Sequence, residues 1–335
     1  AANEALTRAV DKFGYEPKEL LYFRTLHSLC YHWLGLTRSD VMARSNLREF
    51  SKTIGERISS AWEGENLMAL TSKGDTMLFL ENMARNRCIG VREQWNSADS
   101  NISWIHFDWF VRNYSSYKEN NFLTDYTDML ELFLKSQGAP NLEVLIVDEA
   151  QDLSSLQWRC IEKLAENVKH VYVAGDDDQA IYKWAGADVD YLIKNSSNAL
   201  VLKQSYRVPS AVHAIAKQCI GQVRSRIYKE WTPRKEEGLV RWEPNIELVD
   251  MEKGDWLVLA RTNYLLEDID AYCRNEGWFF EVKGRPSISE AKVRAVIFWE
   301  RLVKGDPISL TECANILKFI KVEKPKKLDM LDSNS

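Results

Sequence analysis

The sequence predicts an α/β fold with a parallel sheet, and two observations support this prediction. Residues 142–147 form a short apolar run rich in β-branched residues, as expected of a strand buried in a parallel sheet. Ser154 or Ser155 can cap a helix that continues to about residue 167, and residues 168–174 then have the composition of a second strand. Strand, helix and strand in close succession predict a βαβ unit.

Three later segments extend the predicted α/β pattern. Residues 200–202 are expected to form a third strand, and Pro209 stands where a helix would begin. Residues 256–260 are expected to form a fourth strand after a polar interval.

Residues 34–135 have helical spacing and no clear strand, so we interpret them as a helical insertion. The segment is rich in aromatic residues, which could stack on nucleic-acid bases but which at helical spacing more often form a core. We therefore expect a core role for Trp62, Trp95, Trp104, Phe107, Trp109, Phe110, Tyr114 and Tyr117.

Composition and charge exclude several classes of protein. The 335 residues correspond to about two domains. Lys and Arg number 44 against 49 Asp and Glu, a net charge of −5, so any polyanion site must be a local groove. The chain has no long apolar run and no paired cysteine motif, which predicts a cytoplasmic protein without membrane spans, structural zinc or disulfides. The lysine-rich segment 318–327 is interpreted as a solvated linker rather than a phosphate-binding patch.

Three motifs carry polar side chains that a core does not need. Residues 148–152, Asp-Glu-Ala-Gln-Asp, follow the first strand, where the carboxyl ends of parallel strands bind ligands, although such acids can also merely cap a helix. Residues 175–187 place three aspartates, a glutamine and two aromatics after the second strand, and clustered carboxylates require cations or hydrogen-bond donors. Residues 204–210 place a tyrosine and an arginine just before a helix.

In this order and spacing, the three segments resemble motifs II, III and IV of the UvrD/Rep-type superfamily 1A DNA helicases. Residues 25–29, Thr-Leu-His-Ser-Leu, resemble motif Ib of that family, and residues 259–263 resemble its motif IVa. Ala1, Ala2 and Glu4 would match the end of motif Ia. The resemblance implies RecA-like lobes of the P-loop NTPase type, incomplete in this chain and interrupted by the helical insertion.

On the nucleotide side, the resemblance implies that ATP and Mg²⁺ are cofactors and that five residues serve them. Asp148 would hold Mg²⁺ on the phosphates, and Glu149 would orient and deprotonate the attacking water. Gln179 would contact the γ-phosphate, Arg207 would act as an arginine finger, and Tyr206 would stack on the adenine.

On the nucleic-acid side, the resemblance implies contact with single-stranded DNA and with junctions between single and double strands. Trp184 and Tyr182 would stack on bases without regard to sequence. Four further residues match positions along the strand track, where DNA contact and structural support are alternatives: Thr25, His27, Arg261 and Asn263.

The sequence departs from the family pattern in two respects. It contains no Gly-x-x-x-x-Gly-Lys-Ser/Thr run, so the phosphate-binding P-loop is missing, and motifs V and VI are missing as well. We therefore expect an internal fragment of a longer helicase. In motif III, Lys183 and Ala185 flank Trp184, where the family commonly has glycine and arginine.

These motifs divide the chain into five predicted segments. Residues 1–33 would be a remnant of the first lobe, 34–135 its helical insertion, and 136–205 the part of that lobe with motifs II and III. Residues 206–305 would be a partial second lobe, and 306–335 the start of another insertion or a linker.

The predicted function is ATP-dependent unwinding of DNA or translocation along one strand, with 3′→5′ polarity implied by the resemblance. The fragment alone is expected to be inactive. The source would be a bacterium or a phage, and replication or repair proteins would be partners. Two alternatives remain open: a DNA- or partner-binding protein that hydrolyses nothing, and the helicase subunit of a helicase–nuclease.

Overall fold

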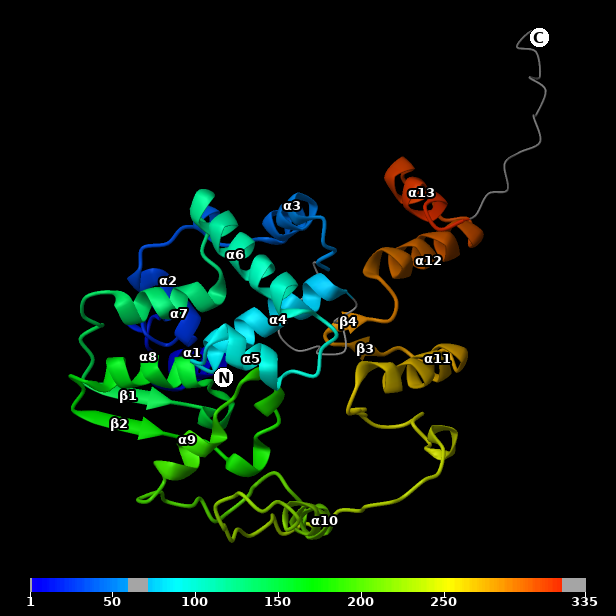
Figure 1. Ribbon diagram of the computed structural model, residues 1–335. Helices are drawn as coiled ribbons and strands as arrows, with labels where there is room; N and C mark the ends of the chain where they lie inside the picture. Colours follow the sequence, from blue (N-terminus) through cyan, green and yellow to red (C-terminus); the bar gives the residue numbers. More distant parts are fainter. Residues whose placement is uncertain (1, 60–71, 321–335) are drawn as a thin grey trace. The chain divides into compact units, whose positions relative to one another are not determined.

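The computed structural model describes residues 2–59 and 72–320 and divides the chain into two compact units, Ala1–Val240 and Arg241–Ser335 (Figure 1). Trp62 and most of the lysine-rich segment 318–327 lie outside the described residues, as does the end of the predicted segment 306–335.

The first unit contains the predicted βαβ motif. Strands β1 (Val144–Val147) and β2 (His170–Val173) pair in parallel, with Val144 opposite His170, and α8 (Ser155–Ala165) connects them. The Ser154 hydroxyl caps α8 by accepting a hydrogen bond from the Gln157 backbone, which confirms one of the two predicted caps. This part of the α/β prediction is confirmed.

One face of the strand pair is covered by helices. Figure 1 shows α8, α7 (Tyr126–Lys135) and α2 (Leu26–Trp33) stacked on one side of the strands. Leu145 and Val147 point into this core with Cys30, Leu130 and Phe133, whereas the alternate residues Val144 and Ile146 are exposed. Although it lies in the predicted insertion, α7 therefore shares the core of the sheet.

A second core lies between four helices of residues 44–120. These are α3 (Arg44–Ile54), α4 (Lys73–Asn86), α5 (Val91–Ser97) and α6 (Trp104–Asn120). The predicted core role of the aromatics is confirmed for Phe107, Phe110 and Tyr114, which are buried together with Phe50. Trp95, Trp104 and Tyr117 pack against this core, whereas Trp109 remains 40% exposed.

A network of charged side chains joins the helical core to α7. Arg85 of α4 forms ion pairs with Glu81, Asp125, Asp128 and Glu131. Lys118 of α6 adds a 2.6 Å ion pair from its Nζ to Asp125 Oδ2. Because removing one partner of such a buried network leaves uncompensated charge, the network fixes how the three helices meet.

Two of the predicted strands are wrong. Residues 200–202 and 256–260 form no strand and pair with none in the part of the chain that the structure describes. Leu200 is 93% exposed and Leu259 81%. An apolar run becomes a strand only where a neighbour can exchange backbone hydrogen bonds with it, and neither run has such a neighbour there.

The described part of the first unit contains three further α-helices. They are α1 (Ala2–Phe13), α9 (Val189–Lys194) and α10 (Ser210–Ile220). Helix α10 begins one residue after Pro209, as the sequence predicts.

The second unit is a short helical assembly. It contains α11 (Glu267–Asn275), a two-stranded antiparallel ribbon of β3 (Glu281–Val282) and β4 (Arg285–Pro286), α12 (Glu290–Val303) and α13 (Leu310–Leu317). Helices α12 and α13 pack together, and Arg301 Nη1 lies 2.8 Å from Glu312 Oε1. None of the helices in residues 2–59 and 72–320 has the length and apolar character needed to cross a membrane.

Candidate functional site

The carboxylates of Asp148 and Glu149 lie directly after β1. Both residues are exposed, and the Glu149 backbone is left-handed, with φ 53° and ψ 41°. This conformation is unfavourable for a residue with a side chain and persists only where the surroundings impose it. Here Ala150 is buried, and its N–H donates to the Ala174 carbonyl at 3.0 Å, which anchors the turn to the segment after β2.

Gln151 is a site residue that the sequence reasoning missed. Its side chain is buried; its Nε2 donates to Glu149 Oε2 at 2.7 Å, and its Oε1 accepts from the Asp176 backbone N–H at 3.0 Å. A glutamine within an acidic segment was the available signal, since one amide can both donate to a carboxylate and accept from a backbone N–H. Gln151 therefore links motif II to motif III.

Close packing accompanies this link. A Cβ on Gly175 would lie 3.0 Å from Gln151 Oε1 and 3.2 Å from the Ala150 Cβ, so glycine lets the two loops approach. At the end of motif II, burial and then the charge of Glu149 raise the pKa of Asp152. The carboxylates of the motif thus sit in two environments, exposed at residues 148 and 149 and partly desolvated at 152.

The three aspartates of motif III are held by cations, as their clustering requires. Arg226 and Lys229, which the sequence reasoning did not identify, form ion pairs with Asp176–Asp178. Gln179 is exposed, and its Nε2 donates to Asp176 Oδ2 at 2.7 Å. Burial alone would raise the pKa of Asp176, but hydrogen bonds from Lys229 and Gln179 lower it below its usual value.

The structure does not bring Tyr206 and Arg207 to these carboxylates. Both side chains are exposed on the loop before α10, and within the described residues no hydrogen bond or ion pair joins either one to Asp148, Glu149 or Gln179. The Ser205 hydroxyl accepts hydrogen bonds from the Arg207 and Val208 backbones at 3.3 and 3.1 Å, which shapes this loop locally. The predicted contacts of the two side chains with ATP stay predictions.

Three of the predicted DNA-binding residues line the same groove. His27, Tyr182 and Trp184 line one groove of about 770 Å³, together with the α4 residues Asn82 and Asn86. The rings of Tyr182 and Trp184 lie 6.2 Å apart. The turn after them depends on Gly186, whose φ is +97° and where a Cβ would lie 3.2 Å from Met83 Sδ and 3.5 Å from Asn86 Cβ of α4.

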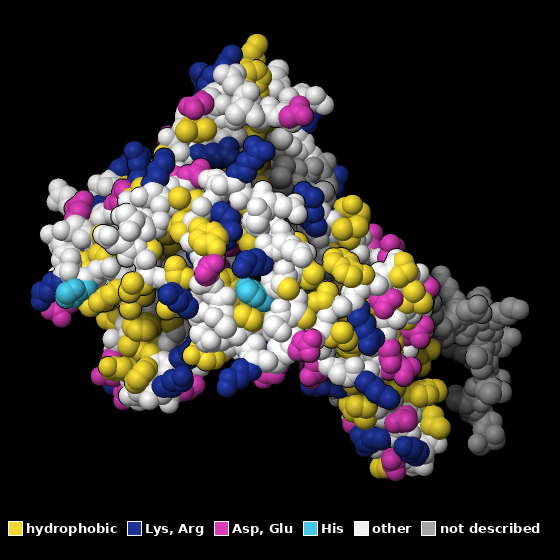
Figure 2. All heavy atoms as spheres, turned by 90° about the horizontal axis from the view of Figure 1, so that it is seen from below, with side chains coloured by type: hydrophobic (Ala, Val, Ile, Leu, Met, Phe, Trp, Pro, Cys, Tyr) yellow, Lys and Arg dark blue, Asp and Glu magenta, His cyan; other side chains and the backbone are white. Residues whose placement is uncertain are grey.

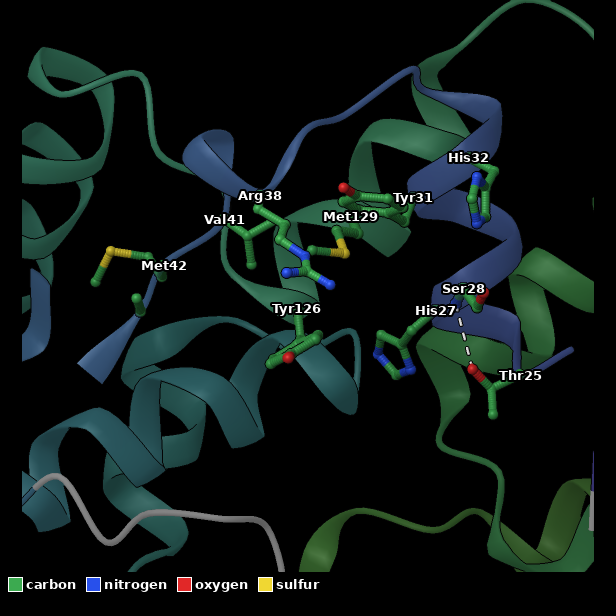
Figure 3. A pocket seen from close by; sticks show the side chains of 11 residues that line it. Thr25, His27, Ser28, Tyr31, His32, Arg38, Val41, Met42, Tyr126 and Met129 are labelled. Carbon is green, nitrogen blue, oxygen red and sulfur yellow. Dashed lines mark hydrogen bonds between the residues drawn. The ribbon is translucent and has the colours of Figure 1, made fainter. Parts of the chain in front are cut away.

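A second hollow of about 570 Å³ adjoins this groove, and His27, Met42, Ala43 and Tyr126 line both (Figure 3). Figure 3 shows the His27 ring beside the Tyr126 ring, with the Arg38 side chain reaching toward the same space. The two rings are 5.8 Å apart and nearly perpendicular. Burial lowers the pKa of His27, so its imidazole is neutral near pH 7.

Thr25 has a demonstrable structural role. Its hydroxyl caps α2 by accepting a hydrogen bond from the Ser28 N–H at 3.3 Å. The hydroxyl also lies at the edge of the second hollow, so capping does not conflict with the predicted DNA contact.

Arg261 and Asn263 belong to the second unit. Both are exposed, and Asn263 begins a short turn of 3-10 helix, Asn263–Leu266. Their predicted DNA contacts stay predictions.

On the face shown in Figure 2, Lys and Arg side chains lie among acidic and hydrophobic ones rather than in one continuous patch. This distribution agrees with the net charge of −5 and with a polyanion site confined to a groove.

Comparison with known proteins agrees with the motifs. Residues 1–199 match the model of the UvrD/REP helicase N-terminal domain. The chain is 26% identical over 296 residues to a probable DNA helicase II homolog of Mycoplasma capricolum, a match that covers 84% of the chain and 39% of that protein.

Two further relatives are named ATP-dependent DNA helicase PcrA. The one from Bacillus subtilis is 27% identical over 198 residues, which is 51% of this chain and 27% of the relative. The one from Staphylococcus aureus strain Mu50 is 22% identical over 361 aligned positions, covering 95% of this chain and 48% of the relative. The chain therefore spans less than half the length of these relatives, and the match of residues 1–199 places it in the UvrD/Rep helicase family.

Proposed function

We propose that this chain is part of an ATP-dependent DNA helicase and carries both the hydrolytic carboxylates and a groove for one DNA strand. The observation that supports this best is the course of residues 175–187. The beginning of this segment bonds to Gln151, which holds Glu149, and its end places Tyr182 and Trp184 in the groove with His27. One short segment thus connects a hydrolytic site to a strand-binding site, which a DNA-dependent ATPase needs.

The nucleotide side follows from the chemistry of the carboxylates. Asp148 offers an exposed carboxylate at the carboxyl end of a parallel strand, a fit for Mg²⁺, which takes one or two protein carboxylates and completes its shell with phosphate oxygens and water. Bound there, Mg²⁺ would neutralise phosphate charge. Glu149, aimed by its left-handed backbone and by Gln151, orients a water and accepts its proton.

Three other side chains complete the proposed nucleotide contacts. Gln179 hydrogen-bonds the γ-phosphate through its amide, which can donate without adding charge. Arg207 contributes a guanidinium to the phosphates, and Tyr206 stacks on the adenine. The exposure of Tyr206 and Arg207 leaves both side chains accessible to a nucleotide.

The nucleic-acid side is a groove suited to stacking. Trp184 and Tyr182 take bases of a single strand irrespective of sequence, and neutral His27 and the Thr25 hydroxyl hydrogen-bond the backbone. Arg261 and Asn263 add contacts from the second unit. We further propose 3′→5′ movement and unwinding at junctions between single and double strands, with replication or repair proteins as partners and the cytoplasm of a bacterium as the location.

The experiment that tests this function is DNA-stimulated ATP hydrolysis, measured on this chain and on the product of the whole reading frame. We expect turnover only from the longer product, because the sequence of this chain has no P-loop to hold the β-phosphate. Robust turnover by the 335-residue chain would contradict that expectation. In the active product, Glu149→Gln should retain ATP and DNA binding and lose hydrolysis by orders of magnitude.

A second candidate function is binding to DNA or to a partner without hydrolysis. The absence of a P-loop from the sequence favours it. If the product of the whole reading frame binds single-stranded DNA but neither it nor this chain hydrolyses ATP, this second function replaces the first.

A further inference from the structure

We propose that Arg226 and Lys229 are positioning residues that hold Gln179 and Glu149 in register for hydrolysis. This inference rests on the function proposed above. The two cations lie in the segment after α10, outside all the segments that resemble helicase motifs.

The cations neutralise three neighbouring carboxylates, two of which, those of Asp177 and Asp178, are largely buried. The Arg226 guanidinium donates two hydrogen bonds to Asp178, from Nε to Oδ1 at 2.7 Å and from Nη2 to Oδ2 at 2.6 Å. The Asp177 side chain is only 3% exposed and is held by Lys229 and by the Ile227 backbone N–H, which lies 2.7 Å from Oδ2. Two-pronged arginine–carboxylate pairs are among the most geometrically specific contacts in proteins.

Lys229 extends the contact to Asp176. Its Nζ lies 2.8 Å from Asp176 Oδ1, while Oδ2 of the same carboxylate accepts the hydrogen bond from Gln179. The interactions with Asp176 and Asp177 raise the pKa of Lys229 despite its partial burial, which on its own would lower it. Lys229 is therefore a fixed positive charge that orients the carboxylate to which Gln179 is bonded.

From Asp176 the contacts lead to Glu149. The Asp176 backbone N–H donates to Gln151 Oε1, and Gln151 Nε2 donates to Glu149 Oε2. A displacement of the aspartate loop would therefore move both Gln179 and the carboxylate proposed to activate water. Small misplacements of such groups are costly to catalysis.

The segment that carries the two cations is also hydrogen-bonded to the motif IV loop. Backbone hydrogen bonds join Ser205 to Thr232 at 2.8 Å and Arg234 to Val208 at 2.9 Å. The loop carrying Tyr206 and Arg207 is thus tied to the segment carrying Arg226 and Lys229. Through these pairs, nucleotide contact at Tyr206 and Arg207 is mechanically linked to Glu149.

The first test uses the 335-residue chain and needs no ATP. Hydrogen exchange is measured on Arg226→Gln, Lys229→Gln and the matched control Arg224→Gln, which alters an exposed arginine two positions away. We expect exchange in residues 148–153 and 176–180 to quicken roughly tenfold in the first two variants, as for loss of a charge-assisted hydrogen bond, and to stay unchanged in the control. Faster exchange confined to residues 224–232 and 176–178 would overturn the inference.

The second test measures hydrolysis by the product of the whole reading frame. Arg226→Gln and Lys229→Gln should lower kcat about tenfold or more, with little change in KM for ATP or in DNA affinity, because positioning is lost while binding is kept. Arg226→Lys keeps the charge but not the two-pronged hydrogen bond, so its kcat should lie between those of the unsubstituted protein and Arg226→Gln. Its melting temperature shows whether it folds. An unchanged kcat would overturn the inference. Absence of hydrolysis in the unsubstituted protein would instead refute the proposed function, and hydrogen exchange would still decide the coupling.

Discussion

Residues 26–194 and the second unit have similar proportions of apolar residues but bury them to different extents. The first region buries two cores, one around Phe133 and Leu130 and one around Phe107 and Phe110. In the described part of the second unit, the buried hydrophobic residues are Cys273, Ala295 and Ile316, while Trp256, Leu257 and Leu259 are exposed. Local helix formation alone therefore does not create a core. The loops that hold Asp148, Glu149 and Gln179 lie in the region that has one.

The largest loss of stability is expected when a buried aromatic of the first region is removed. Phe107→Ala removes a side chain that is fully buried and should lower the free energy of unfolding by about 3–5 kcal/mol. Leu259→Ala in the second unit should change it by less than about 0.5 kcal/mol. Urea denaturation followed by tryptophan fluorescence measures both, and equal losses would mean that the two regions are packed alike.

The next effect concerns pH and the charged network that joins the two cores. Burial raises the pKa of Glu81 to about 7 from 4.5, against the opposing charge of Arg85. The folded protein then keeps a proton that the unfolded chain releases, so the stability from Glu81 is present below pH 4.5 and is lost as pH rises toward 7. Across this window the stability of the protein relative to Glu81→Gln should fall by on the order of 3 kcal/mol.

The control for this pH dependence is Glu119→Gln, at an exposed position of the same helical region. Unfolding is followed in urea at half-unit steps from pH 4 to 8. Asp125 acts in the opposite direction: burial would raise its pKa, but Arg85 and Lys118 lower it, so its contribution is lost only in acid. A flat difference between wild type and Glu81→Gln over the window would show that Glu81 is ionised in the folded protein.

A smaller effect is expected on the affinity for single-stranded DNA, and it should distinguish the aromatic residues of the groove from other exposed aromatic residues. Trp184→Ala should weaken binding to single-stranded DNA by about 1–3 kcal/mol for all base compositions alike. Trp109→Ala, half-exposed on α6 and away from the groove, is the matched control and should leave binding unchanged. Fluorescence anisotropy with oligonucleotides of several compositions measures both, and a loss restricted to one composition would contradict stacking.

The smallest effect compares two helix caps. Ser154→Ala removes the cap of α8 and a 3.2 Å contact with Asn86 of α4, so it should cost about 1–2 kcal/mol. Ser289→Ala removes the cap of α12 in the second unit and should cost about 1 kcal/mol or less. Melting temperatures of the two variants test the order, and a reversed order would mean that the contact with Asn86 adds nothing.

Much of the first region could be predicted from the sequence because its signals are local. The β-branched run at β1, the caps near Ser154 and the helical spacing of Phe107, Phe110 and Tyr114 each reflect a short-range preference that the packing reinforces. The predicted strands at 200–202 and 256–260 failed for the converse reason. Their apolar residues satisfy the composition of a strand, but a strand also requires a partner, which composition cannot supply.

The candidate site divides in the same way. Asp148, Glu149, Gln179 and Trp184 were proposed as site residues because they lie in segments whose order and spacing resemble motifs II and III of the family. Gln151, Arg226 and Lys229 were missed because their importance lies in contacts across 25 to 52 positions of sequence. No local pattern distinguishes Arg226 from Arg224, two residues before it.

The sequence by itself determined the βαβ unit, the helical character of the described part of residues 34–135 and the motifs that place the chain in its family. These features depend on side-chain periodicity and on the order of residues. Only the tertiary structure decided that Glu149 adopts a left-handed backbone, that Gln151 joins it to the aspartate loop, and that Arg226 and Lys229 neutralise that loop. The physical reason is that buried charge and backbone strain persist only where distant segments converge to compensate them.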